Sequence, residues 1–121
     1  MKMTIEAKRV YEAPRKKGGY RVLVDRLWPR GLRKDEVHID LWLKDVAPSN
    51  TLRKWFDHDP AKWAQFQRRY FSELDGQQES VDQLVASAKG RPIVLLYGAR
   101  DVEHNQAVAL KKYLEHRMAK D

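Results

Sequence analysis

Two short apolar runs constrain the fold of this 121-residue chain more than any other feature of its sequence. They are Val22-Leu23-Val24 and Ile93-Val94-Leu95-Leu96-Tyr97. An apolar run without polar alternation is typical of a strand that is buried on both faces, and such strands occur mostly in parallel sheets. We therefore expect an α/β fold, with a small parallel or mixed β-sheet flanked by helices in a single layered domain over residues 1–121.

Weaker strand patterns lie before and after the first run. Residues 4–10 have mixed strand character, the first run is expected to extend from Tyr20 to Trp28, and residues 37–43 alternate as a short strand would. Residues 13–19 form a basic loop with breakers at both ends. A usual parallel crossover takes about a dozen residues or more, and the connection over 11–19 is shorter, so the sheet is either parallel or mixed.

Helical patterns fill most of the chain between the two runs and the segment after the second. Apolar residues recur at helical spacing over about residues 50–89, and a C-terminal helix is expected over about 102–118. A residue suited to helix capping precedes each expected helix. These caps are Ser49, Asp59, Ser80 and Asp101.

The sequence excludes several classes of site. It has no cysteine, which rules out disulfides and thiolate chemistry, and its apolar runs are too short to cross a membrane. No apolar stretch follows Met1, so we expect a cytoplasmic protein without a membrane partner. No nucleotide-binding or zinc motif occurs, and Asp57-His58-Asp59 suits a turn better than a metal site because adjacent side chains diverge. The cofactor and the oligomeric state stay unknown.

Positive charge collects in the first third of the chain. The formal net charge is +7, and residues 1–34 carry eleven basic and three acidic side chains. Such a surface favours an anionic partner, either a small anionic ligand or nucleic acid, although a well-solvated basic surface explains the same charge. In the nucleic-acid interpretation, Arg15-Lys16-Lys17 would grip phosphates.

Polar turns follow both apolar runs. Ligands of open α/β sheets bind beyond the carboxyl ends of the strands, and two parallel neighbours would bring these turns to one rim. We predict a pocket for a small anionic ligand there, in which arginines fork onto a phosphate or carboxylate. The predicted ligand-binding residues are Arg26, Trp28, Arg30, Ser49, Arg53, Tyr97 and Asn105.

Two residues of this rim are able to transfer protons. Asp25 and His104 are the candidate catalytic groups if the protein is an enzyme, a point that the sequence leaves open. We expect His104 in the first turn of the last helix. Structural alternatives exist, because Asp25 would also fix its turn by pairing with Arg26 or Arg30. Ser49 would also serve only as a helix cap.

Several blocks of sequence together resemble a known family. The most specific is Arg21-Val22-Leu23-Val24-Asp25-Arg26-Leu27-Trp28-Pro29-Arg30-Gly31, and Leu95-Leu96-Tyr97-Gly98-Ala99-Arg100-Asp101 with His104-Asn105 is another. Over about residues 4–115 the chain resembles the YeaO-like branch of the bacterial DUF488 family (domain of unknown function 488). The resemblance implies a small bacterial protein and names no settled activity. Longer relatives carry a cysteine motif near the place of His104-Asn105-Gln106, and this chain has no cysteine there.

Overall fold

A four-stranded parallel sheet organises the protein. The computed structural model describes residues 4–12 and 19–118. Its strands are β1 (Ile5–Arg9), β2 (Tyr20–Leu23), β3 (Leu41–Trp42) and β4 (Ile93–Tyr97), in the order β1-β4-β2-β3. Every neighbouring pair is parallel, which decides between the two expected sheets. The short connection after β1 is compatible with this arrangement because β4 lies between β1 and β2, so the connection does not join adjacent strands. The basic loop over 13–18 lies outside the described residues.

The two apolar runs are buried on both faces of the sheet, as expected. Val22, Ile93 and Leu95 point into the larger of two apolar clusters, whereas Leu23 and Leu96 belong to the smaller one. This alternation follows the two-residue period of a strand. Each run therefore contributes apolar side chains to a cluster on either side of the sheet. If every second residue were polar, one of the two clusters would lose the apolar side chains that the strands supply.

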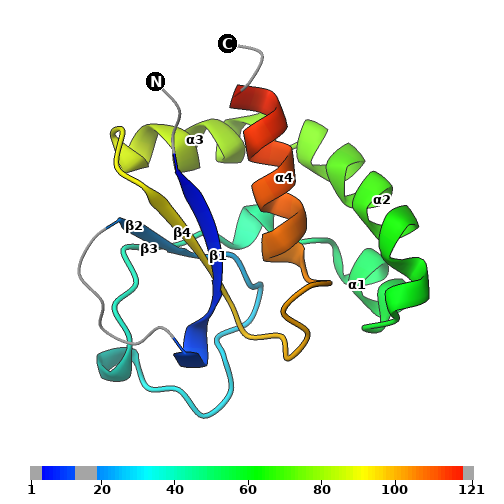
Figure 1. Ribbon diagram of the computed structural model, residues 1–121, viewed down its shortest axis with the longest axis horizontal. Helices are drawn as coiled ribbons and strands as arrows, with labels where there is room; N and C mark the ends of the chain where they lie inside the picture. Colours follow the sequence, from blue (N-terminus) through cyan, green and yellow to red (C-terminus); the bar gives the residue numbers. More distant parts are fainter. Residues whose placement is uncertain (1–3, 13–18, 119–121) are drawn as a thin grey trace.

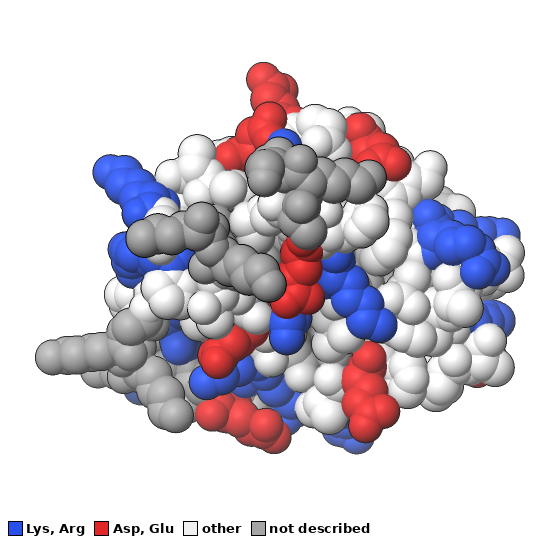
Figure 2. All heavy atoms as spheres, turned by 45° about the horizontal axis from the view of Figure 1, so that its top comes forward, with Lys and Arg blue, Asp and Glu red and all other residues white. Residues whose placement is uncertain are grey.

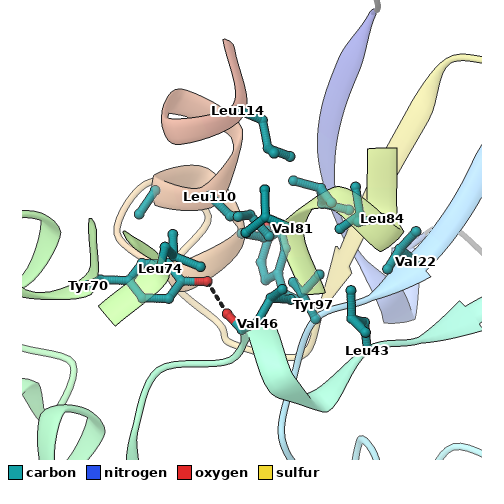
Figure 3. Packing of buried hydrophobic residues seen from close by; sticks show 14 of the residues in the cluster. Val22, Leu43, Val46, Tyr70, Leu74, Val81, Leu84, Tyr97, Leu110 and Leu114 are labelled. Atoms are coloured by element: carbon teal, nitrogen blue, oxygen red, sulfur yellow. Dashed lines mark hydrogen bonds between the residues drawn. The ribbon is translucent and has the colours of Figure 1, made fainter. Parts of the chain in front are cut away.

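Four helices cover one face of the sheet. They are α1 (Asn50–Phe56), α2 (Trp63–Asp75), α3 (Gln78–Ala88) and α4 (Gln106–Met118). All four contribute buried side chains to the larger cluster, and α4 packs directly on β1 and β4 (Figure 1). Tyr70 of α2 donates its hydroxyl hydrogen to the carbonyl of Val46 inside this layer (Figure 3). That bond satisfies both polar groups where water does not reach them.

A loop covers the opposite face of the sheet, and no described helix on that face is longer than one turn. The loop runs from residue 24 to residue 40 and includes the 3-10 turn Lys34–Glu36. Val37 is buried there against Leu23 and Leu96, and Trp28 and Trp42 pack edge to face at 5.4 Å. The four α-helices lie on one face of the sheet. On the opposite face, two indole rings and a few aliphatic side chains are enough to cover the short strands.

Several element boundaries differ from the sequence-based expectation. The strand expected over residues 37–43 is confined to Leu41–Trp42. β2 ends at Leu23 and not near Trp28, because the carboxylate of Asp25 turns to the amide of Gly98. α3 begins at Gln78, so Ser80 lies inside it and caps nothing. α4 begins at Gln106, four residues later than expected.

The late start of α4 has a clear cause. Asp101 accepts hydrogen bonds from the amides of Glu103 and His104 and so closes a separate turn. Asn105 then accepts from the amide of Val108 and caps the helix itself. His104 therefore precedes α4 and does not belong to its first turn.

Candidate functional site

A cleft of about 700 Å³ lies at the carboxyl ends of the strands. The segments that follow β1 and β4 come together at the lower end of the molecule in Figure 1. Those that follow β2 and β4 line the cleft together with α1, α2 and the segment before α1. Its polar and charged lining residues are Tyr11, Asp25, Arg26, Arg30, Arg53, His58, Arg100, Asp101, His104, Asn105 and Gln106. Two segments about seventy residues apart in the sequence thus share one cavity, as the parallel arrangement of β2 and β4 requires.

Asp25 fastens these two segments to each other. One carboxylate oxygen accepts a hydrogen bond from the amide of Gly98 at 2.8 Å, and the other accepts from the side-chain amide of Gln106. Gly98 permits this approach because a Cβ atom there would lie 3.0 Å from the Asp25 carboxylate. No ion pair joins Asp25 to Arg26 or Arg30 within the described residues, so the alternative role of a turn-fixing ion pair is wrong.

Burial changes the acidity of Asp25. Desolvation raises the pKa of this carboxyl to about 6, and the hydrogen bonds from Gly98 and Gln106 oppose the rise. Desolvation acts against the charged form, whereas donors to a carboxylate favour it. A carboxyl group with a pKa near neutrality is suited to exchanging a proton at physiological pH.

Four arginines line the cleft without an acidic partner. Arg26, Arg30, Arg53 and Arg100 form no ion pair with any residue that the structure describes. Arg26 donates only weakly to the carbonyls of Ala47 and Pro48, at 3.5 and 3.4 Å. Its Nε atom is buried and has no hydrogen-bond partner in the described part of the chain. The cleft therefore carries an excess of positive charge, because its lining has four arginines against the two carboxyl groups of Asp25 and Asp101.

Asp101 holds the imidazole of His104. Nδ1 of His104 lies 2.9 Å from the Asp101 carboxylate, and the ring meets Trp63 edge-on at 5.3 Å between centroids. The pKa of Asp101 lies below its usual range. The main cause is the hydrogen bond that the amide of Glu103 donates to the carboxylate, and the contact with the His104 ring is the next. Within residues 4–12 and 19–118, Nε2 of His104 has no hydrogen-bond partner. This nitrogen is the one able to contact a ligand in the cleft.

Two predicted site residues lie outside the cleft. Ser49 caps α1, accepting from the amide of Leu52, and its hydroxyl donates to Glu73 at 2.5 Å. Tyr97 is buried under the rim, where desolvation raises its pKa and its hydroxyl meets Asn105. The other predicted residues all line the cavity: Asp25, Arg26, Trp28, Arg30, Arg53, His104 and Asn105.

Sequence reasoning missed several lining residues. Arg100 and Gly98 lie in the turn after β4, which the sequence places at the rim, but neither is among the predicted site residues, although the charge of Arg100 was a signal. Phe56 and Phe66 were expected in the core, and they do pack in it while also forming part of the cavity wall. Nothing in the sequence indicated that Leu27 lines the cavity, because a single aliphatic residue in a polar turn can be either buried or exposed.

Neither a metal site nor a membrane-spanning helix is found among residues 4–12 and 19–118. No group of three or more potential ligands (His, Asp or Glu) comes together in the described part of the chain. Asp57 and His58 follow the last residue of α1, and both have a left-handed backbone conformation, with φ of 47° and 54°.

Among the described helices, none has the length and apolar character needed to span a bilayer.

The sequence of the whole chain is similar to that of several known proteins. The family model described as the inactive DUF488-N3 subclade (DUF488-N3i) matches residues 4–121. The chain belongs to this family. It is 40% identical to the uncharacterized protein YeaO of Escherichia coli over 112 residues, which cover 93% of this chain and 97% of YeaO. It is 38% identical over 114 residues to the uncharacterized proteins Mb3100c of Mycobacterium bovis and Rv3073c of Mycobacterium tuberculosis, covering 93% of this chain and 95% of each. No solved structure matches.

Membership confirms the resemblance found in the sequence. The rim of the cleft in this chain consists of an arginine-rich turn after β2 and a turn after β4 that is followed by His104. The names of the relatives assign no ligand to those proteins. The chemistry of the cleft is therefore the basis on which a function is argued.

Proposed function

We propose that this DUF488-N3i protein binds a small organic anion, a phosphate or a carboxylate, in the cleft at the carboxyl ends of β2 and β4. The observation that carries the proposal is the set of four arginines without acidic partners around one cavity. Arginine forks match the geometry of both anions, and charge-assisted hydrogen bonds are about twice as strong as neutral ones. Asp25 and Asp101 only partly offset this charge.

The buried Nε atom of Arg26 adds to this argument. A buried donor without an acceptor costs about 1–3 kcal/mol. An anion beside Arg26 supplies that acceptor when the side chain turns its Nε atom toward the cleft. Proteins rarely keep such a group unless it serves a site or is otherwise compensated, so the position of Arg26 supports binding.

Binding, and not turnover, is the role that we assign to the cleft. The description of the matching family as inactive supports this choice. Asp25 then holds the two rim segments together, and His104 offers Nε2 to the ligand while Asp101 fixes its ring. An enzyme would use the same two groups for proton transfer, so a measured turnover of any bound compound would replace this assignment.

A matched pair of variants in α1 tests the proposal. Arg53 lines the cleft and Lys54, its neighbour, does not, and both side chains are exposed. A thermal-shift panel of inorganic phosphate, organic phosphates and di- and tricarboxylates identifies a ligand. Such a ligand at one hundred times its dissociation constant stabilises the fold by ~2.7 kcal/mol. We expect Arg53→Gln to weaken its binding about tenfold in calorimetry, and Lys54→Gln to leave it within twofold.

Two results would contradict the proposal. One is the absence of any stabilising anion in the panel. The other is equal weakening by Arg53→Gln and Lys54→Gln, which would mean that general surface charge attracts the anion. Arg26→Gln and Arg30→Gln extend the test, with circular dichroism showing that each variant is folded.

Nucleic acid is the alternative partner. The basic first third of the chain favours it, but Arg15-Lys16-Lys17 lie outside the described residues. On the face drawn in Figure 2, basic side chains of the described residues lie in several separate groups, with acidic side chains between some of them. Phosphate backbones need a stripe of positive charge, so the compact cluster at the cleft fits a small anion better.

A further inference from the structure

Two of the three large apolar side chains that are exposed among the described residues line the cleft. The three are Tyr11 at 37%, Leu27 at 64% and Val102 at 54%. Tyr11 and Leu27 line the cavity, and Val102 follows Asp101 in the turn beside it. A bare inorganic anion would leave the apolar surface of Tyr11 and Leu27 in water. A soluble protein that keeps its apolar exposure next to uncompensated arginines has a surface suited to a partly apolar ligand.

The inner wall of the cavity is also apolar. Trp28 lines it from the loop after β2, and Phe56 and Phe66 line it from α1 and α2. The centroids of the two phenyl rings are 4.4 Å apart, and Trp63 packs behind both, 5.6 Å from Phe66 and 6.0 Å from Phe56, in a triangular cluster. Rigid aromatic walls favour planar rings, which stack against them with little loss of conformational freedom.

The volume of the cleft agrees with a larger ligand. Cavities of ~300–1,000 Å³ typically hold drug-sized molecules, and this cleft of about 700 Å³ lies in that range. A lone phosphate contacts only a few arginine side chains and leaves most of this space filled by water.

We propose, on the basis of the anion-binding function above, that the ligand is amphipathic, with a phosphate or carboxylate head on a planar aromatic body. The head lies against the arginines and the aromatic body covers Leu27, Tyr11 and the ring wall. Selectivity then comes from both parts, since neither an anion nor an aromatic compound alone satisfies the whole lining.

Three probes separate the two parts of this ligand. Isothermal calorimetry compares naphthyl phosphate, which has both parts, with inorganic phosphate and with naphthol. We expect naphthyl phosphate to bind at least tenfold more tightly than either of the others. Apolar burial supplies this gain over phosphate, because each buried CH₂ or its equivalent contributes ~0.8 kcal/mol, or about fourfold.

A second matched pair of variants locates the aromatic body. Leu27→Ser changes a side chain that lines the cavity, and Val102→Ser changes one of similar exposure that does not. Both side chains are mainly in solvent, so neither change disturbs the fold. We expect Leu27→Ser to weaken naphthyl phosphate roughly fivefold without changing the affinity for inorganic phosphate. Val102→Ser should change neither.

Each other result has a distinct meaning. Equal affinity for naphthyl phosphate and inorganic phosphate overturns the amphipathic ligand and leaves the anion-binding function standing. The same conclusion follows if Leu27→Ser weakens both probes, or neither. Equal affinity for naphthol and naphthyl phosphate removes the anionic head and overturns both proposals. Absence of binding for all three probes contradicts the amphipathic ligand, and the anion panel then decides the fate of the broader function.

Discussion

At the scale of single residues, Asp25 has the least ordinary environment in the cleft. Its carboxyl carries a pKa of about 6 against an ordinary 3.8, because burial penalises the charged form more than Gly98 and Gln106 stabilise it. The folded protein therefore keeps a proton on Asp25 at a pH where the unfolded chain has lost it. Unfolding releases that proton, so a rise in pH through this interval favours unfolding.

This difference makes a prediction about stability. The contribution of Asp25 to the free energy of unfolding of the wild-type protein should fall by up to about 3 kcal/mol between pH 4 and pH 6.5, since one pKa unit is worth ~1.4 kcal/mol. Asp25→Asn removes the ionisation, and its amide keeps both partners if the Gln106 amide turns over. Urea denaturation at several pH values measures the effect. Parallel stability curves for wild type and variant would show that Asp25 titrates normally.

At the scale of elements, the start of α1 positions Arg53. The Ser49 hydroxyl oxygen accepts a hydrogen bond from the amide of Leu52. The amide and the hydroxyl of Ser49 both donate to Glu73 of α2, at 2.8 and 2.5 Å. One residue thus caps α1 and ties it to α2. Arg53 follows one turn later, so the direction of its side chain toward the cleft depends on this junction.

Ser49 and Ser80 make a second prediction, because the sequence marks both as caps and the structure uses only one. Ser49→Ala should destabilise the protein by about 1–2 kcal/mol, as loss of a helix cap does. Ser80→Ala, inside α3, should change stability by less than about 0.5 kcal/mol or raise it slightly. Chemical denaturation measures both. Equal losses would mean that Ser49 contributes no more than an ordinary helical serine.

The elements also show what sequence patterns are able to predict. The buried strands, the helix α1 with its Ser49 cap and the rim position of the arginines all follow from periodicity and from the rule for parallel strands. The start of α4 does not, because Asp101 and Asn105 are both good caps and only tertiary contacts decide which one the helix uses. The end of β2 likewise depends on Gly98, a residue from the far end of the chain.

The candidate site was predictable to a similar extent. Seven of the nine predicted site residues line the cleft, since charge and position near strand ends are visible in the sequence. Ser49 and Tyr97 do not line it, because whether a side chain faces a cavity or the interior depends on packing. Exposure of Leu27 and the double role of Phe56 have the same cause.

At the scale of the whole molecule, the distribution of charge distinguishes the two proposed partners. A protein that neutralises several phosphates of duplex DNA loses affinity steeply with salt, with a log–log slope of ~0.9 per phosphate. A charged ligand in a partly enclosed cleft is screened less. We expect duplex DNA, followed by fluorescence anisotropy, to be released near ~0.15 M salt, and naphthyl phosphate to stay within about threefold of its low-salt affinity. Tight DNA binding at that salt would favour the nucleic-acid alternative.

The place of β4 in the sheet has a consequence for how the molecule is made. β1 and β2 are translated before β4, which follows β2 by roughly seventy residues, yet each of them pairs with β4. Until β4 has been synthesised, β1 therefore lacks its neighbour in the described sheet, and the edges of β1 and β2 that face β4 stay unpaired. We expect the cleft to form only after β4 has been synthesised, because the turn that follows β4 supplies part of its lining.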